Sequence, residues 1–327
     1  MNPHELRTVF MGSPAFAVPT LRSLVEAGYD LVAVYSQPDR PAGRGRALVA
    51  PDVKRVALEY GLPVLQPERL RTAEAREQLR ELRPDLIVVA AYGQILRPAV
   101  IDLPRHGCLN VHASLLPRHR GASAVAAAIL AGDAESGVSI MQIDPGMDTG
   151  PVLSQRSTPL LDDDTTGTLA ERLSRIGAEL LVETLPDWVA GHVRAAPQDE
   201  AHATQAPPIA KEDGAIDWTK PAMRLWREVR AYNPWPLSST RFRGEPLQML
   251  EAWPLTNTAV AEPAPGTVME LPAAAELSAE RRQRAAFAVA AGAGLLVPLS
   301  VRRAGRGAVS AAEFARGARG LSGSVLG

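Results

Sequence analysis

The sequence predicts an α/β fold, with a doubly wound, mostly parallel sheet followed by a small β-barrel domain. Three observations support this prediction. Short apolar runs alternate with helical patterns in the first half of the chain, which is typical of a parallel sheet covered by helices. A segment without apolar periodicity follows, and many short apolar runs separated by turn residues come after it. The 327 residues, of which 46% are hydrophobic, suffice for roughly two domains.

Six apolar runs are the predicted strands of the first sheet. They are Thr8–Met11, Leu31–Tyr35, Pro63–Leu65, Leu86–Ala91, Gly107–His112 and Val138–Ile143. The predicted helices between them are Pro19–Ala27, Asp52–Tyr60, Ala73–Leu82 and Ser123–Ala131. Glycines at 28, 61 and 132 directly follow three of these helices, where a left-handed residue commonly ends a helix.

A long helical pattern runs from Thr165 to His192, and we expect Pro186 to break it. The acidic run at 162–164 precedes this pattern, and we interpret it as favouring the positive end of the helix rather than as a metal site. Arg194 to Ala215 is rich in Ala, Pro, Gln and acidic residues, so we predict an interdomain linker there. The expected division is a first domain at 1–193, a linker at 194–215 and a second domain at 216–327.

Beyond this linker the sequence predicts a small domain built mainly from strands. We expect a strand at Ile216–Trp218, a helix at Pro221–Ala231, and strands near Ser238–Phe242, Gln248–Ala252, Gly266–Met269, Ala286–Ala290 and Leu295–Val301. The many short strands favour a small barrel, but their spacing alone does not distinguish one small β domain from another.

The composition limits the function classes. The longest nearly apolar stretch, Ala285 to Leu299, contains two glycines and a proline and is shorter than the ~20 residues of a membrane-spanning helix. Residues 1–10 have no apolar signal-peptide core, so we expect a cytoplasmic protein without a membrane partner. The single Cys108 excludes an internal disulfide and a multi-cysteine zinc site, and we interpret it as a small buried hydrophobic residue.

Charge is distributed unevenly along the chain. Residues 211–327 carry 15 basic and 11 acidic side chains, although the whole chain has a formal net charge of −1. This basic excess would favour a nucleic-acid partner, but an ordinary solvated surface is an alternative explanation.

Three polar residues follow apolar runs of the predicted sheet. Asn110 and His112 lie two residues apart at the end of one strand, so strand alternation points both side chains to the same side. Asp148 lies in the turn after the next predicted strand, and ligands of open parallel sheets bind where strands end. We therefore expect an amide, an imidazole and a carboxylate to converge. An isolated Asn-x-His pair could instead only satisfy backbone groups.

These residues, with the Ser-Leu-Leu-Pro run at 114–117 and the Asp-x-Gly-x-Asp-Thr-Gly turn at 144–150, resemble the folate-dependent formyltransferases. Within this family, the motifs at 9–19, 37–45 and 233–236 are similar to those of the branch that acts on methionyl-tRNA. The resemblance extends from about Arg7 to the end of the chain. One departure is Ser123-Ala124, where the family commonly has Ala-Pro; Ser123 can cap the following helix instead.

The resemblance implies a transferase that moves the formyl group of 10-formyltetrahydrofolate to the amino group of methionine on initiator tRNA. Asn110 and His112 would stabilise the tetrahedral oxyanion and Asp148 would accept the amine proton, without a metal. The folate pocket would be formed by two segments, Ser114, Leu115, Leu116, Pro117 and Gln94, Ile95, Leu96. The resemblance also implies that the second domain is an oligonucleotide/oligosaccharide-binding-like barrel that binds tRNA. We expect a monomer.

The segment Gln37–Lys54 follows a strand and is rich in Pro, Gly and basic residues. Its side chains Arg40, Arg44, Arg46 and Lys54 are the predicted tRNA contacts, because arginine binds phosphate and stacks on unpaired bases. Without a nucleic-acid substrate, a solvated connection would explain the same composition.

Two alternative functions remain open from the sequence. The chain could formylate another amine, on an amino-sugar nucleotide or on glycinamide ribonucleotide. It could also be a catalytically inactive module that binds RNA or folate. The basic segment argues against the first alternative, and the presence of all three polar site residues argues against the second.

Overall fold

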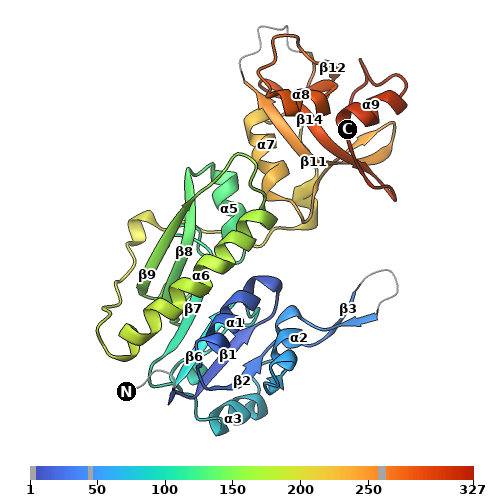
Figure 1. Ribbon diagram of the computed structural model, residues 1–327. Coiled ribbons are helices and arrows are strands. Elements are labelled where there is room, and N and C mark those ends of the chain that lie inside the picture. Colours follow the sequence, from blue (N-terminus) through green and yellow to red (C-terminus); the bar gives the residue numbers. More distant parts are fainter. Residues whose placement is uncertain (1–4, 43–46, 257–262) are drawn as a thin grey trace. The chain divides into compact units, whose positions relative to one another are not determined.

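The computed structural model describes residues 5–42, 47–256 and 263–327 (Figure 1). The chain divides into two compact units. The first unit consists of Met1–Val125, Glu135–Pro159 and Leu169–Pro207, and the second of Ala126–Ala134, Leu160–Thr168 and Pro208–Gly327. The α/β class of the first unit and the β class of the second are confirmed.

A seven-stranded sheet in the order β5-β2-β1-β6-β7-β8-β9 forms the first unit. Its strands are β1 (Thr8–Gly12), β2 (Leu31–Tyr35), β5 (Val64–Leu65), β6 (Leu86–Ala90), β7 (Cys108–His112), β8 (Glu135–Gln142) and β9 (Val152–Pro159). The first five are parallel to one another, whereas β8 pairs antiparallel with both of its neighbours, β7 and β9. The central strands β1 and β6 are buried along their whole length, as expected for continuous apolar runs.

Four helices occupy the predicted places between strands: α1 (Val18–Glu26), α2 (Asp52–Glu59), α3 (Ala73–Glu81) and α5 (Ala124–Ala131). The long helical pattern forms α6 (Thr166–Val189), whereas α4 (Pro98–Ile101) and a short 3-10 turn at Ala15–Ala17 were not predicted. In Figure 1 the long helix α6 runs beside β8. Gly177 allows this close approach, because a Cβ atom there would lie 2.6 Å from Cγ1 of Val111 and 3.2 Å from Cγ1 of Val138.

The expected break at Pro186 is wrong, because α6 continues through this residue to Val189. A proline inside a helix removes one backbone donor and crowds the preceding turn. Here the proline is exposed and lies in the last turn of the helix. Few helical hydrogen bonds follow it because the helix ends at Val189. The end of the helix is also fixed by Trp188, whose Nε1 donates to the carbonyl oxygen of His106 at 2.9 Å.

The segment after α6 is bound to the first unit rather than free. Ala196 pairs with Val152, and Gln205 forms a backbone bridge with Arg120. The amide of Arg120 donates to the carbonyl of Thr204 at 2.9 Å, and the carbonyl of Arg120 accepts from the amide of Ala206 at 2.7 Å. We call residues 196–206 the strap. It includes a 3-10 turn at Glu200–His202 and lies within the segment expected as a linker.

A short hairpin of β3 (Arg40–Ala42) and β4 (Ala47–Val49) forms part of the basic segment expected as a loop. Its base is held by a polar cluster. Lys54 Nζ lies 2.9 and 2.8 Å from the two carboxylate oxygens of Asp39 and 2.8 Å from Oε1 of Gln66. Hydrogen bonds from Gln66 and Lys54 lower the pKa of Asp39.

The second unit is an antiparallel half-barrel sheet in the order β10-β11-β14-β13-β12, with β15 paired to β14. Its elements are a 3-10 turn (Lys211–Gly214), α7 (Ala222–Ala231), β10 (Ser238–Phe242), β11 (Glu245–Leu255), β12 (Val268–Glu270), α8 (Ala279–Arg284), β13 (Phe287–Ala290), β14 (Leu295–Arg303), β15 (Ala308–Ser310) and α9 (Ala311–Gly317). The strand expected at 216–218 is not formed, since only Ala215 bridges to Ser239. Trp218 instead packs in the core, where its Nε1 donates to Thr240 at 3.1 Å.

Within the described part of the chain, every helix is too short or too polar to span a bilayer.

Candidate active site

A cavity of about 580 Å³ opens at the ends of β6 and β7 in the first unit. The loop after β6, the end of β7, the start of α5 and the turn at 144–148 form its wall. Apolar side chains dominate the lining, among them Phe16, Val125 and Met141. Two further apolar residues, Ile95 and Met147, are 68% and 59% exposed, so the cavity offers apolar surface to a ligand at its mouth.

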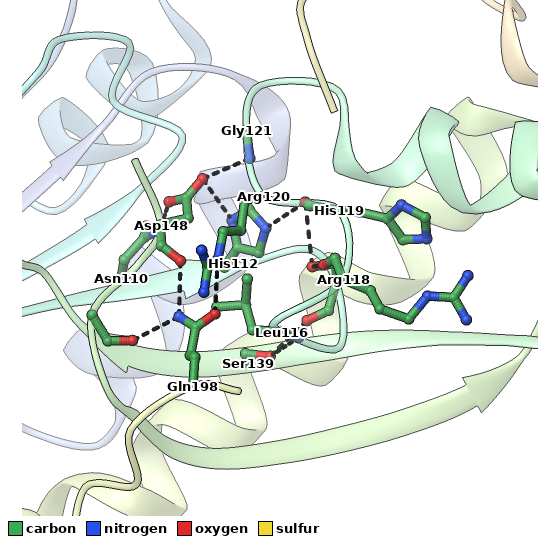
Figure 2. A network of polar contacts seen from close by, with 12 residues as sticks. Asn110, His112, Leu116, Arg118, His119, Arg120, Gly121, Ser139, Asp148 and Gln198 are labelled. Carbon is green, nitrogen blue, oxygen red and sulfur yellow. Dashed lines mark hydrogen bonds and ion pairs between the residues drawn. The ribbon is translucent and has the colours of Figure 1, made fainter. Parts of the chain in front are cut away.

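Asn110, His112 and Asp148 all line this cavity, and Figure 2 shows that they lie close together. Asn110 Nδ2 is 3.5 Å from Asp148 Oδ1, and His112 Nδ1 is 3.6 Å from Asp148 Oδ2. The alternation of β7 places the first two side chains on the same face of the sheet, and the turn after β8 supplies the carboxylate. The structure thus brings together the three residues that the strand pattern predicted.

Each nitrogen of the His112 ring has its own neighbour. Nε2 lies 3.1 Å from the carbonyl oxygen of His119. Because a carbonyl oxygen only accepts hydrogen bonds, Nε2 carries a hydrogen, and Nδ1 is the nitrogen that faces Asp148. The side chain of His112 is 7% exposed and that of Asp148 is 20% exposed, so their contact is largely shielded from water.

Asp148 has an uncommon backbone conformation, with φ of +52°. Aspartate is among the few non-glycine residues that tolerate this left-handed region. Its Oδ2 accepts a hydrogen bond from the backbone N–H of Gly121 at 2.8 Å. The turn before it is closed by Asp144, whose Oδ1 accepts from the amide of Gly146 at 3.0 Å and from the hydroxyl of Thr149 at 2.7 Å.

Gly121 is required at its position for two reasons. Its φ is +118°, which side-chain-bearing residues rarely adopt. A Cβ atom there would also lie 2.6 Å from the carbonyl oxygen of Ala206 in the strap. At the departure Ser123-Ala124, helix α5 begins at Ala124, directly after Ser123.

Three polar residues around Asp148 were missed by the sequence analysis: Arg120, Gln198 and Glu200. Gln198 Nε2 donates to the carbonyl oxygens of Asp148 at 2.8 Å and Gly150 at 2.7 Å (Figure 2). Arg120 Nε donates to Gln198 Oε1 at 3.0 Å, and its two terminal nitrogens donate to the two oxygens of Glu200 at 2.9 and 2.7 Å. The hydrogen-bonded ion pair between Arg120 and Glu200 raises the pKa of Arg120 and lowers the pKa of Glu200. No sequence pattern marks these residues.

The two segments predicted for folate lie in different surroundings. Gln94, Ile95 and Leu96 line the cavity, and the amide of Gln94 fixes the loop by accepting from Leu70 N at 2.7 Å and donating to Pro67 O at 3.0 Å.

Ser114, Leu115, Leu116 and Pro117 do not line this cavity, and their contact with folate stays a prediction. Their polar groups bind the protein itself: Ser114 Oγ donates to Arg118 O at 2.6 Å, and Leu116 N donates to Ser139 Oγ at 3.0 Å. Since these bonds fold the loop after β7 back on β8, the run has a structural role in shaping the site.

The predicted tRNA contacts are only partly described. Arg40 is exposed on β3, and its Nη2 lies 3.5 Å from Gln37 Oε1. Lys54 is bound to Asp39 and Gln66, and its side chain is 22% exposed. Arg44 and Arg46 lie outside the described residues.

Other reactive groups do not form a second centre among the described residues. No cluster of three or more His, Cys, Asp or Glu there has the arrangement of a metal site. Cys108 is buried in β7, and burial raises the pKa of its thiol to about 12. This agrees with its interpretation as a buried hydrophobic residue.

Comparisons with known proteins agree with this architecture. Residues 6–185 match the formyl transferase family model, and residues 208–319 match that of the formyl transferase C-terminal domain. The methionyl-tRNA formyltransferase of Roseiflexus sp. is 49% identical over 98% of this chain and 95% of its own length. That of Methylococcus capsulatus is 46% identical over 98% of this chain and all of its own length.

Solved structures with the same fold have lower sequence identity. HypX from Aquifex aeolicus, in complex with tetrahydrofolic acid, is 17% identical with a TM-score of 0.62 and matches 98% of this chain and 48% of its own. WlaRD, a sugar 3N-formyl transferase, is 15% identical with a TM-score of 0.64 and matches 93% of this chain and 99% of its own. At these identities the likeness concerns the fold alone.

Proposed function

The chain belongs to the methionyl-tRNA formyltransferase family, and from this premise we propose that Asn110, His112 and Asp148 carry its formyl transfer. The donor would be 10-formyltetrahydrofolate and the acceptor the amino group of methionine on initiator tRNA. One observation supports the assignment above others: an amide, an imidazole and a carboxylate meet at the wall of a largely apolar cavity.

The transfer needs an oxyanion donor and a proton acceptor. The amine nitrogen attacks the formyl carbon, a C–N bond forms, and the formyl oxygen becomes an oxyanion. Asn110 Nδ2 lies 3.5 Å from Asp148 Oδ1, which is long for a hydrogen bond. The Asn110 amide can therefore donate to the formyl oxyanion. The intermediate then collapses, the bond to N10 of the folate breaks, and N10 takes up a proton. The products are the N-formylated methionyl ester and tetrahydrofolate.

Asp148 and His112 handle the proton. An α-amino group has a pKa near ~7.7–8.0, so part of it is already neutral at neutral pH. As the C–N bond forms, the amine loses a proton, and the Asp148 carboxylate is the negatively charged acceptor of the trio. His112 Nδ1 lies next to the same carboxylate and is the ring nitrogen left for the reaction, since Nε2 donates to His119. The pair can pass the proton to the leaving N10.

The apolar cavity fits a flat folate ring. A volume of about 580 Å³ is in the usual range for a small-molecule site. The lining from Phe16, Val125 and Met141 supplies apolar surface, while backbone groups of the loop at 91–96 supply hydrogen bonds for the ring edges. These features support residues 94–96 as the folate contacts.

The acceptor is proposed to be held by basic residues. Arg40, Arg44 and Arg46 belong to the basic segment at 37–54, and the basic excess of residues 211–327 would favour binding to the tRNA backbone. An enzyme that formylates charged tRNA works where translation occurs, which supports a cytoplasmic location. We also expect a monomer.

The central test is turnover with both substrates. The purified protein would be mixed with 10-formyltetrahydrofolate and methionyl initiator tRNA, and formylmethionine would be measured by mass spectrometry after hydrolysis of the ester. We expect formation that depends on both substrates. Parallel reactions with an amino-sugar nucleotide and glycinamide ribonucleotide test the other acceptors. Formylation of one of these alone, or binding of folate and tRNA without product, would contradict the proposal.

Selection of the initiator tRNA is proposed to involve Arg44. A basic Pro- and Gly-rich segment can bind an acceptor end whose bases are unpaired. Arg44→Leu should lower the rate on charged initiator tRNA without weakening folate binding, and Arg44→Lys should restore it only partly because the planar guanidinium is lost. Kinetics with open and closed terminal base pairs measure this, and an unchanged preference would place the contact elsewhere.

A further inference from the structure

The strap carries Gln198, which bonds to the turn that holds Asp148, and Glu200, which bonds to Arg120; neither residue lines the cavity. We propose that Gln198 is a positioning residue for Asp148, and that Arg120 holds Gln198 in the orientation this role needs. The inference rests on the proposed function of Asp148. It extends that function to a segment that the sequence predicted to be only a linker.

The amide of Gln198 uses both of its functional groups in this network. Its Nε2 donates one hydrogen bond to the carbonyl of Asp148 and another to the carbonyl of Gly150, at 2.8 and 2.7 Å. Its Oε1 accepts from Nε of Arg120 at 3.0 Å. Carbonyl oxygens only accept and a guanidinium only donates, so the amide has a single satisfactory orientation. Figure 2 shows the hydrogen bonds of the Gln198 amide as dashed lines.

The two bonds from Gln198 hold the turn on both sides of Thr149. Asp148 has φ of +52°, a conformation that the chain would otherwise rarely adopt. Gly150 packs closely against the backbone of Gln142, because a Cβ atom at position 150 would lie 1.9 Å from the carbonyl oxygen of Gln142. By holding the carbonyls of residues 148 and 150, Gln198 stabilises the conformation that directs the Asp148 carboxylate toward Asn110 and His112.

Arg120 connects this anchor to a second one. Its side chain is only 2% exposed, and a buried charge requires partners, which Gln198 and Glu200 provide. The next residue, Gly121, donates its backbone N–H to Oδ2 of Asp148 at 2.8 Å. Neighbouring residues therefore hold Asp148 at its carboxylate directly and at its backbone through Gln198. A shift of the Arg120 backbone would disturb both contacts.

The test replaces Gln198 by glutamate, which has nearly the same shape. The new carboxylate can still accept from Arg120, but it would place an acceptor against the carbonyls of Asp148 and Gly150. We expect kcat to fall on the order of 100-fold, the effect of misplacing a reacting group by about 1 Å. The KM values for folate and tRNA should change little, because Gln198 touches neither proposed site.

The matched control is Gln248→Glu in the second unit. Arg302 Nε donates to Gln248 Oε1 at 2.8 Å, so this substitution changes the same kind of Arg–Gln pair in a different sheet. It should leave kcat at the wild-type value. Thermal unfolding of both variants would show that they are folded. Gln198→Leu, which removes the amide without adding charge, provides a second variant if Gln198→Glu does not fold.

A double substitution separates positioning from general damage to the fold. If Gln198 acts through Asp148, Gln198→Glu should lower kcat much less in an Asp148→Asn background than in the wild type. Full multiplication of the two effects, or wild-type kcat in both Gln198 variants, would overturn the inference. Failure of the wild-type protein to formylate methionyl-tRNA would instead refute the proposed function. In that case a crystal structure of Gln198→Glu decides: Asp148 should leave the left-handed region, and unchanged geometry would overturn the inference.

Discussion

Replacing Asp148 with asparagine tests the carboxylate while leaving size and backbone preference nearly unchanged, because asparagine also tolerates a positive φ. In the wild type, Oδ2 accepts from Gly121 N at 2.8 Å and Oδ1 from Asn110 Nδ2 at 3.5 Å. If the asparagine oxygen takes the Gly121 hydrogen bond, its NH₂ group faces the NH₂ group of Asn110. The opposite orientation sets the new NH₂ group against the Gly121 N–H. Either way, two donors face each other.

The expected magnitude follows from two contributions. A hydrogen bond to a charged acceptor contributes about 1.5–3 kcal/mol and a neutral one about 0.5–1.5, so the bond to Gly121 weakens by about 1 kcal/mol. Loss of the proton acceptor lowers the rate by about 10²- to 10⁴-fold, or about 3–5 kcal/mol in the barrier. We therefore expect kcat to fall by about 10²- to 10⁴-fold, while the free energy of unfolding decreases by only about 1 kcal/mol.

Single-turnover formylation with excess enzyme and urea unfolding measure these two quantities. Asp163→Asn, at an exposed position before α6, is the control for removing one carboxylate. A single-turnover rate of Asp148→Asn equal to that of the wild type would refute the role of the carboxylate. A large loss of stability would show that Asp148 acts mainly in holding the loop at Gly121.

Three further predictions concern the first unit. Asn110→Ala should lower the single-turnover rate on the order of 100-fold through loss of an oxyanion donor, with folate affinity unchanged by titration; a normal rate would remove Asn110 from the mechanism. Gly177→Ala gains about 1 kcal/mol of helix propensity, but overpacking against Val111 costs about 1–3 kcal/mol, so urea unfolding should show a net loss of stability and a gain would mean that α6 has room. Cys108, with its pKa raised to about 12, should resist iodoacetamide at pH 8 until urea unfolds the protein, and rapid labelling of the native state would contradict its burial.

The strands that the sequence predicted well are those with both faces buried. In β1 and β6 every residue is buried, so each strand is a continuous apolar run bounded by polar residues. Strand β9 was missed because it lies at the edge of the sheet and alternates exposed with half-buried residues, among them serine, glutamine and arginine. Pro186 was misjudged because the rule for prolines inside helices considers the local sequence alone. It does not include the hydrogen bond from Trp188 to His106, which fixes the end of the helix.

The candidate site divides in the same way. Asn110 and His112 were placed on one face by strand alternation, and Asp148 was placed near them because it follows the next strand. Arg120 and Gln198 could not be predicted, since they are 78 residues apart and their contact depends on the path of the strap. The strap is bound by backbone hydrogen bonds and by polar side chains, and neither leaves an apolar period in the sequence.

The path of the strap decides where the first unit can be separated for study. A fragment that ends at residue 193, the boundary suggested by composition, would lack Gln198 and the backbone partners of Arg120. Its sheet would be complete, yet the turn around Asp148 would have lost one anchor. A fragment that ends at Pro207 retains the whole first unit, so folate binding and the geometry of the trio should be measured in that longer fragment.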